Sequence, residues 1–110
     1  MRWKIEFYDV KVMKSIDRWP VHLGTKFTRI VDLIEEFGPD GVGMPHIKAL
    51  GQGLFEIRVK ATEGIGRAFF CTIKGKVIII LNEFIKKTQK TPQNEIDLAK
   101  KRMKEVKDNE

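Results

Sequence analysis

The side chains of this sequence that could do chemistry are mostly cations, and several recur at strand-like spacing in its second half. Arg58 and Lys60 alternate with apolar residues, so period-2 geometry places both on one face of a strand. Arg67 follows a short glycine-containing turn, so it could lie opposite them on the next antiparallel strand. Because it starts a hairpin strand, we expect its side chain to lie outside the core. Such a group of cations suits the binding of phosphate.

A second group of side chains ends the next strand-like stretch. It contains one amide, one aromatic ring and two cations: Asn82, Phe84, Lys86 and Lys87. Proteins stack a base and hold a phosphodiester with this combination. Strand parity places the first three on one face and Lys87 on the other, unless a β-bulge intervenes. The structural alternative is a charged sheet edge that prevents unwanted strand pairing.

Motifs of several other enzyme classes are missing. The sequence contains no Walker-type phosphate loop, no GxGxxG fingerprint and no GxSxG nucleophile elbow. Two histidines and one cysteine cannot build a standard zinc centre, so we expect no metal site and no cofactor. We interpret His22 and His46 as surface or half-buried residues and Cys71 as a core residue. Trp3 and Trp19 are expected to pack in the core.

The elements that must position the cations are predicted in the order β-α-α-β-β-β-α. Residues 38–53 hold five of the nine glycines and are predicted to be a loop that contains Lys48. The glycines in 63–66 predict the hairpin turn before Arg67. This order is typical of an α+β fold with a small, mainly antiparallel sheet and helices packed against it. The hydrophobic periodicities give the bounds 3–9, 10–18, 21–37, 55–61, 67–73, 77–81 and a C-terminal helix that begins at Thr91-Pro92.

The C-terminal helix is highly charged and has a narrow apolar stripe. Thr91 is expected to be its N-cap and Pro92 its first residue. The stripe, which should face the sheet, consists of Ile96, Ala99, Met103 and Val106.

Length and composition indicate one soluble globular domain that spans residues 1–110. The chain has 110 residues, of which 42% are hydrophobic and 33% charged. No apolar run approaches the ~20 residues of a membrane span, and no signal peptide is apparent. A single cysteine excludes an internal disulfide. We therefore expect a cytoplasmic protein that does not contact the membrane.

The net charge of +6 is concentrated in one part of the sequence. Residues 46–90 contain nine bases and three acids, whereas bases and acids are balanced over 1–45 and over 91–110. A basic block inside a folded segment favours a polyanionic partner such as RNA. A solvated face that only keeps the protein soluble is the alternative interpretation.

Two stretches of the sequence resemble the HigB-like branch of the RelE/ParE toxin superfamily. They are GLFEIRVKATEGIGRAFF, residues 53–70, and VIIILNEFIKKTQKTPQNEIDLAKKRM, residues 77–103. The first strand, the helix broken at Trp19-Pro20 and the segment MPHIKAL before the hairpin also fit. The resemblance covers nearly the whole chain and implies a RelE-like fold.

The resemblance implies the toxin of a type II toxin–antitoxin system, with a HigA-like helix-turn-helix antitoxin as its partner. Such toxins enter the ribosomal A site and cut mRNA there without a metal or a small-molecule cofactor. The 2′-hydroxyl of the RNA attacks the adjacent phosphorus and leaves a 2′,3′-cyclic phosphate. The enzyme implied is an endoribonuclease.

The resemblance also implies roles for the cations. Arg58, Arg67 and Lys87 fall on catalytic positions, with Arg67 as the donor that stabilises charge on the phosphate. The RNA-binding positions are Lys48, Lys60, Asn82, Phe84 and Lys86, of which Phe84 would stack a base. Many relatives have a histidine where this chain has Asn82, and the sequence offers no conventional general acid near its end.

Two other functions remain open at this point. A ParE-like toxin of the same fold would inhibit DNA gyrase by binding and would have no nuclease activity. A non-catalytic RNA-binding or ribosome-associated module would use the same cations without cleaving RNA.

Overall fold

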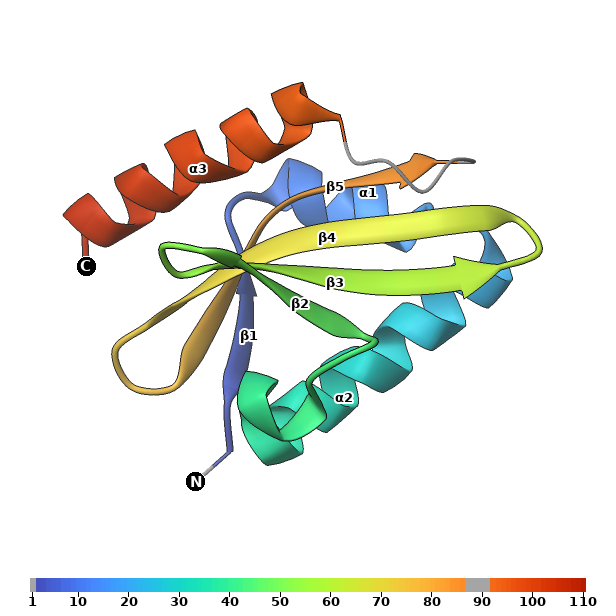
Figure 1. Ribbon diagram of the computed structural model, residues 1–110, viewed down its shortest axis with the longest axis horizontal. Coiled ribbons are helices and arrows are strands. Elements are labelled where there is room, and N and C mark those ends of the chain that lie inside the picture. The colour runs from blue at the N-terminus through green and yellow to red at the C-terminus, as the bar shows by residue number, and fades with distance from the viewer. Residues whose placement is uncertain (1, 87–91) are drawn as a thin grey trace.

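Five strands form one mixed sheet in the order β1-β5-β4-β3-β2 in the computed structural model, which describes residues 2–86 and 92–110 (Figure 1). β1 runs parallel to β5, and every other pair of neighbours is antiparallel. The strands are β1 (Lys4–Phe7), β2 (Ile47–Gly51), β3 (Leu54–Ala61), β4 (Gly64–Ile73) and β5 (Val77–Lys86). The helices are α1 (Val10–Asp17), α2 (Val21–Val42) and α3 (Gln93–Asp108).

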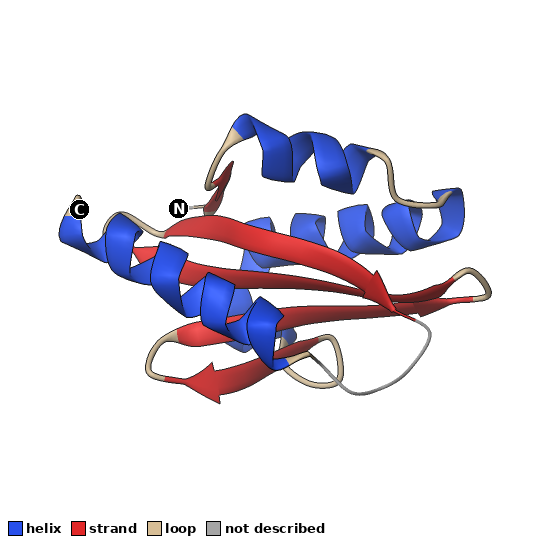
Figure 2. Ribbon diagram, turned by 90° about the horizontal axis from the view of Figure 1, so that it is seen from above, coloured by secondary structure: helices blue, strands red, loops and turns tan. Residues whose placement is uncertain are grey.

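The helices lie on both faces of the sheet (Figure 2). α1 and α2 pack on one face, where the buried cluster includes Trp19, Leu23, Phe27, Ile34, Ala68, Phe70 and Ile80. α3 packs on the other face through the predicted apolar stripe, against Leu54, Phe69, Cys71, Ile79 and Leu81. The α+β class, the helix pair broken at Trp19 and the sheet-facing stripe of α3 are thus confirmed.

The first two helices begin with different caps. The side chain of Asp9 accepts a hydrogen bond from the Val12 amide and caps α1. α2 follows Pro20 and has no cap from its own N-cap side chain. Its first amides donate instead to the carboxylate of Glu63, which lies at the turn between β3 and β4. The tip of this hairpin is thereby attached to the start of α2.

Several local predictions were wrong, including the bounds of β4, which begins at Gly64 instead of Arg67, and of β5, which continues past Leu81 to Lys86. β2 lies within the segment predicted as a loop. Its residues show no clear alternation of apolar and polar side chains, and their strand conformation depends on pairing with β3. The hairpin turn is Thr62-Glu63, and Gly64 already belongs to β4. Regular helix does end at Gly38, whose φ is +78°, but a further helical turn follows it and extends α2 to Val42. The predicted N-cap Thr91 lies outside the described residues, and Pro92 precedes the first helical residue of α3.

A β-bulge in β5 decides which residues face α3. Phe69 pairs with Asn82 and Phe70 with Ile80, so Leu81 is the extra residue. Leu81 and Asn82 therefore both lie on the α3 side, although they are adjacent in sequence. The bulge places Phe84 and Lys86 on that face too. Of the described helices, none is long and apolar enough to cross a membrane.

Candidate functional site

Two cross-strand rows of side chains bring most of the predicted site residues together. In the first row, Arg58 on β3 pairs with Arg67 on β4, which pairs with Phe84 on β5. Directly opposed residues have Cβ atoms about 4.5–5.5 Å apart. The predicted approach of Arg58 to Arg67 is thus confirmed by the register.

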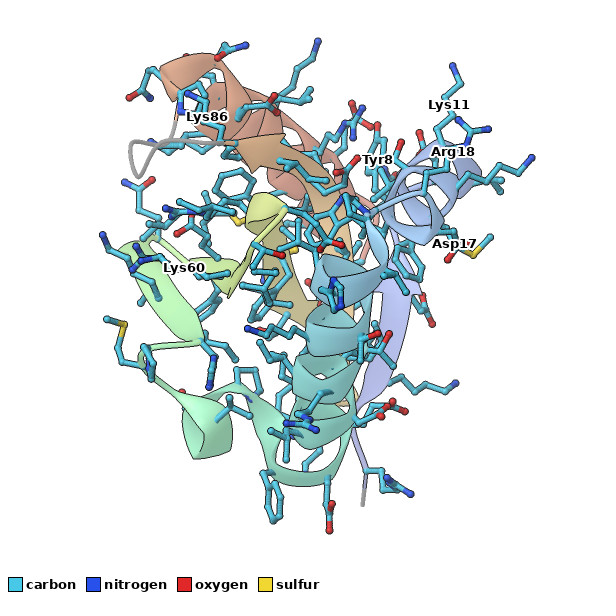
Figure 3. All side chains as sticks on the ribbon, turned by 90° about the vertical axis from the view of Figure 1, so that its right-hand side faces the viewer. Tyr8, Lys11, Asp17, Arg18, Lys60 and Lys86 are labelled. Carbon is cyan, nitrogen blue, oxygen red and sulfur yellow. The ribbon has the colours of Figure 1, made fainter. Side chains whose placement is uncertain are left out.

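The second row lies two residues closer to the turn of the β3–β4 hairpin. Lys60 pairs with Ile65, which pairs with Lys86, so two lysines flank an apolar residue. Figure 3 shows Lys60 and Lys86 on the side of the molecule away from Lys11 and Arg18. We call the surface made by Arg58, Lys60 and Lys86, with Arg67 at its base, the cationic face.

α3 leaves the cationic face uncovered because it packs on the other end of the same side of the sheet. Asn82 marks the boundary, since its side-chain amide donates to the backbone carbonyl of Glu95 at 3.1 Å in the first turn of α3. Asn82 is only 4% exposed, so its contribution is to fix the start of α3 rather than to offer a free amide. Its Oδ1 atom is buried and has no hydrogen-bond partner among the residues that the structure describes.

A buried carboxylate holds the two arginines. Glu56 Oε1 accepts a hydrogen bond from Arg67 Nη1 at 2.8 Å and lies 3.5 Å from Arg58 Nε. The side chains of Glu56 and Arg67 are 2% and 3% exposed. The expectation that Arg67 lies outside the core was wrong. A position at the start of a strand does not reveal that its side chain pairs with the buried carboxylate of Glu56 on the neighbouring strand. A buried charge of this kind needs its partner.

Arg58 is the more accessible of the two arginines. Its side chain is 28% exposed, and its backbone amide donates to the carbonyl of His46 at 2.8 Å. The guanidinium is therefore anchored from below by Glu56 while part of it faces solvent. This geometry fixes an arginine that can meet an anion without ordering a flexible side chain.

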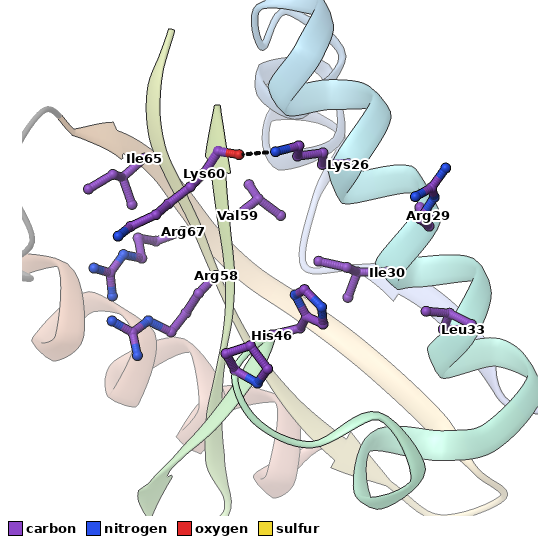
Figure 4. A pocket seen from close by; sticks show the side chains of 11 residues that line it. Lys26, Arg29, Ile30, Leu33, His46, Arg58, Val59, Lys60, Ile65 and Arg67 are labelled. Atoms are coloured by element: carbon purple, nitrogen blue, oxygen red, sulfur yellow. Dashed lines mark hydrogen bonds between the residues drawn. The ribbon is translucent and has the colours of Figure 1, made fainter. Parts of the chain in front are cut away.

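A groove of about 430 Å³ continues the cationic face over the edge of β3 (Figure 4). Figure 4 shows Arg58, Lys60 and Arg67 on one side of β3, α2 on the other, and His46 between them. The charged or titratable residues that line the groove are Lys26, Arg29, His46, Arg58, Lys60 and Arg67.

The remaining predicted residues lie around this centre. Lys48 on β2 is exposed and pairs in register with Glu56, so it extends the face toward the edge of the sheet. Phe84 is half-buried, and its ring stacks on Phe69 with centroids 5.9 Å apart. Lys87 falls outside the described residues, and its predicted catalytic role stays a prediction.

Other titratable groups are engaged away from this region. The Tyr8 hydroxyl donates to Glu105 at 2.6 Å, and this hydrogen bond raises the pKa of Tyr8. Burial raises the pKa of the Cys71 thiol, as befits the core position predicted for it. Over residues 2–86 and 92–110, no three His, Cys, Asp or Glu side chains come together as a candidate metal site.

Sequence reasoning missed four members of the site: Lys26, Arg29, His46 and Glu56. His46 stands next to the predicted Lys48, but its approach to Arg58 depends on β2, which the sequence did not predict. Lys26 and Arg29 appeared to be ordinary surface residues of a helix. The signal for Glu56 was present in its alternation with Arg58, which places both on one face.

Comparison with known proteins identifies relatives of this chain. Residues 14–104 match the family model described as phage derived protein Gp49-like (DUF891). No curated protein matches the sequence. Among solved structures, the chain is similar to one in the crystal structure of the archaeal RelE-RelB complex from Pyrococcus horikoshii OT3. That alignment has a TM-score of 0.56 and 20% identity, and it covers 77% of this chain and 96% of the other. The predicted resemblance and the RelE-like fold are confirmed.

Proposed function

The chain belongs to the Gp49-like family of phage-derived proteins, and we propose that it is the toxin of a type II toxin–antitoxin system. Its activity is metal-independent, ribosome-dependent cleavage of mRNA, which stops translation. The observation that carries this proposal is the pair Arg58–Arg67, fixed by one buried carboxylate at the centre of a cationic face that α3 leaves uncovered. RelE of the archaeal complex was crystallised with RelB, and by analogy this chain pairs with a helix-turn-helix antitoxin.

The reaction needs charge stabilisation at a phosphate. The 2′-oxygen attacks the adjacent phosphorus, its proton passes to a base, the bond from phosphorus to the 5′-oxygen breaks, and an acid protonates that oxygen. Negative charge grows on the non-bridging oxygens, where a preorganised guanidinium stabilises the transition state more than the ground state. Arg58 is the group that contacts the phosphate, in place of the predicted donor Arg67, whose side chain is 3% exposed, and the Arg67–Glu56 pair holds Arg58 in position.

Proton transfer falls to groups beside Arg58. His46 lines the groove, and imidazole is the side chain that most readily exchanges a proton near neutral pH. Lys60 and Lys86 flank the same centre and neutralise phosphates on either side of the cleaved bond. Lys48 binds the RNA further along the sheet, and Phe84 offers part of its ring to a base.

The proposal is tested with Arg58→Ala in a reconstituted translation reaction. Loss of a charge-stabilising donor typically lowers the rate ~100–1,000-fold, and we expect mRNA cleavage to fall by that factor. The matched control is Lys11→Ala, which removes one exposed cation from α1 and should leave cleavage unchanged. Circular dichroism would verify that both variants fold.

Full cleavage by Arg58→Ala would remove Arg58 from the mechanism. If the wild-type protein left mRNA intact on the ribosome but inhibited DNA supercoiling by gyrase, the ParE-like function would replace the proposed one. If RNA bound without being cut, the protein would be a binding module.

A further inference from the structure

The wall of the groove opposite β3 is built by one face of α2. Lys26, Arg29, Ile30 and Leu33 stand at positions i, i+3, i+4 and i+7, so they form a stripe along the helix. The stripe is cationic at its first two positions and apolar at its last two: Lys26 and Arg29 are exposed, Ile30 is buried, and Leu33 is 36% exposed. Figure 4 shows Lys26 and Ile30 extending from α2 toward β3, with Arg29 and Leu33 further from the strand on the same helix.

The edge of β3 is a poor template for an added strand. The Arg58 amide already donates to His46 O, and the Lys60 carbonyl accepts a hydrogen bond from Lys26 Nζ at 2.6 Å. These two groups point away from β4, and both are used within the chain. An extended peptide would have to displace them in order to pair with the strand. The groove therefore favours a ligand that is held by side chains.

The side chains of the groove match the two parts of a nucleotide. Among the described residues, no Asp or Glu lines the groove, and the Glu56 carboxylate is buried beneath the arginines. Lys26 and Arg29 can neutralise a phosphate, while Ile30 and Leu33 offer an apolar wall to a base. A volume of about 430 Å³ lies within the range of small-ligand sites.

We propose that this groove is a binding subsite for one nucleotide of single-stranded RNA that flanks the phosphate held by Arg58. The strand crosses the edge of β3, with a phosphate on Arg29 and Lys26 and its base against Leu33 and Ile30. This proposal rests on the proposed function, because it extends the same RNA from the cationic face onto α2. Lys26 and Arg29 of α2 lie across the edge of β3 from the cationic face. The proposed subsite makes them part of the substrate site.

The test is the binding of fluorescein-labelled hexauridylate to the full-length protein, measured by anisotropy between about 50 and 200 mM salt. Arg29→Ala should weaken binding about threefold or more at the low end of this range. It should also lower the slope of log K against log salt by roughly 0.7, the value for one phosphate contact in a single strand. Lys11→Ala is the charge-matched control and should change neither quantity.

Leu33→Ser tests the apolar wall. It should weaken binding several-fold and leave the salt slope unchanged, because no cation is lost. Lys26 is avoided as a test position because it also bonds the Lys60 carbonyl. Thermal unfolding curves would verify that each variant is folded.

Four results would overturn the subsite. Equal effects of Arg29→Ala and Lys11→Ala would indicate non-specific electrostatics. Loss of binding in Arg58→Ala alone would contradict the subsite and leave the proposed function standing, whereas normal binding by all of these variants would contradict both. Displacement of the RNA by octaglutamate at a lower concentration than by unlabelled RNA would assign the groove to an acidic peptide.

Discussion

At the scale of single residues, the cationic face depends most on Glu56. Its carboxylate meets Arg67 at 2.8 Å and Arg58 at 3.5 Å while almost fully buried. Two arginines of one row are therefore held by one side chain. A face made only of cations would repel itself, and the buried negative charge offsets part of that repulsion.

Arg67→Met tests this arrangement. It leaves a buried carboxylate without one of its cationic partners, and breaking a buried pair in this way costs about 3–5 kcal/mol of unfolding free energy. The double variant Glu56→Leu/Arg67→Met should regain much of that loss, because an apolar pair can replace a buried ion pair. Chemical denaturation of the single and double variants measures both.

Activity should respond differently from stability. Without Glu56, the Arg58 side chain loses its anchor, so the double variant should remain a poor nuclease although it folds. A single Arg67→Met variant as stable as the wild type would contradict the structural role given to the pair.

The residues that make up the site, and their burial, could be predicted only in part from the sequence. Alternation of apolar and charged residues places Arg58 on the same face as Glu56, and the hairpin brings Arg67 opposite, as the register confirms. Burial of Arg67 could not be predicted, because it depends on how closely the two strands and Glu56 pack. His46 joined the site only through β2.

At the scale of elements, the position of Arg67 depends on the packing of its neighbour Gly66 against Trp19, which lies in the connection between α1 and α2. A Cβ atom at Gly66 would lie 2.6 Å from the Trp19 ring and 2.9 Å from Val59. Trp19 is itself fixed, since its indole N–H donates to Glu83 at 2.6 Å and its ring packs edge-on against Phe27. Close approach of β4 to Trp19 therefore requires glycine.

Gly66→Ala should destabilise the protein by about 1–3 kcal/mol, the usual cost of overpacking a core. Gly24→Ala is the matched control: its new methyl group meets nothing closer than 3.9 Å, and alanine favours the interior of α2 by about 1 kcal/mol. Thermal unfolding should show a lower midpoint for the first variant and a higher one for the second. The same direction of change in both would refute the packing argument.

The attachment of the β3–β4 hairpin to α2 should depend on pH. Burial tends to raise the pKa of the Glu63 carboxyl, but hydrogen bonds from His22 and from the amides of His22 and Leu23 outweigh it and lower that pKa. A lowered pKa in the folded state adds stability above the unfolded-state pKa and loses it as pH falls through the folded value. Wild-type protein should therefore lose more stability on acidification than Glu63→Gln, as unfolding titrations at several pH values would measure. Parallel curves for the two proteins would contradict this prediction.

Elements themselves differed in how well the sequence predicted them. The sequence pattern predicted α1, the stripe of α3 and the strand β3 closely, whereas β4 begins three residues before its predicted start and β5 ends five residues beyond its predicted end. β2 was missed because a short edge strand among glycines takes its conformation from its partner rather than from its own residues. The position of the bulge at Leu81 could not be predicted either. Strand parity had indicated only that a bulge would change the face on which the following residues lie.

At the scale of the whole molecule, the surplus positive charge lies at the end of the sheet that α3 leaves uncovered. Residues 46–90 carry the basic excess, and those of them that the structure describes, 46–86, supply the strands that form the cationic face and one side of the groove. The residues described at this face offer cations and one imidazole, with no cluster of metal-ligating side chains. Such a site holds a phosphate well but does little to align the 2′-hydroxyl with the phosphorus. Alignment of this kind can lower the activation barrier by about 7–11 kcal/mol.

We therefore predict that the ribosome supplies this alignment. The most direct measurement incubates one mRNA with purified protein, alone and on programmed ribosomes, and maps the ends of the products. The account predicts that free RNA stays intact at stoichiometric concentrations and that the ribosome-bound message is cut to fragments with a 2′,3′-cyclic phosphate and a 5′-hydroxyl. Efficient cutting of free RNA, or products that bear a 5′-phosphate, would contradict it, because a water nucleophile would then have replaced the 2′-hydroxyl.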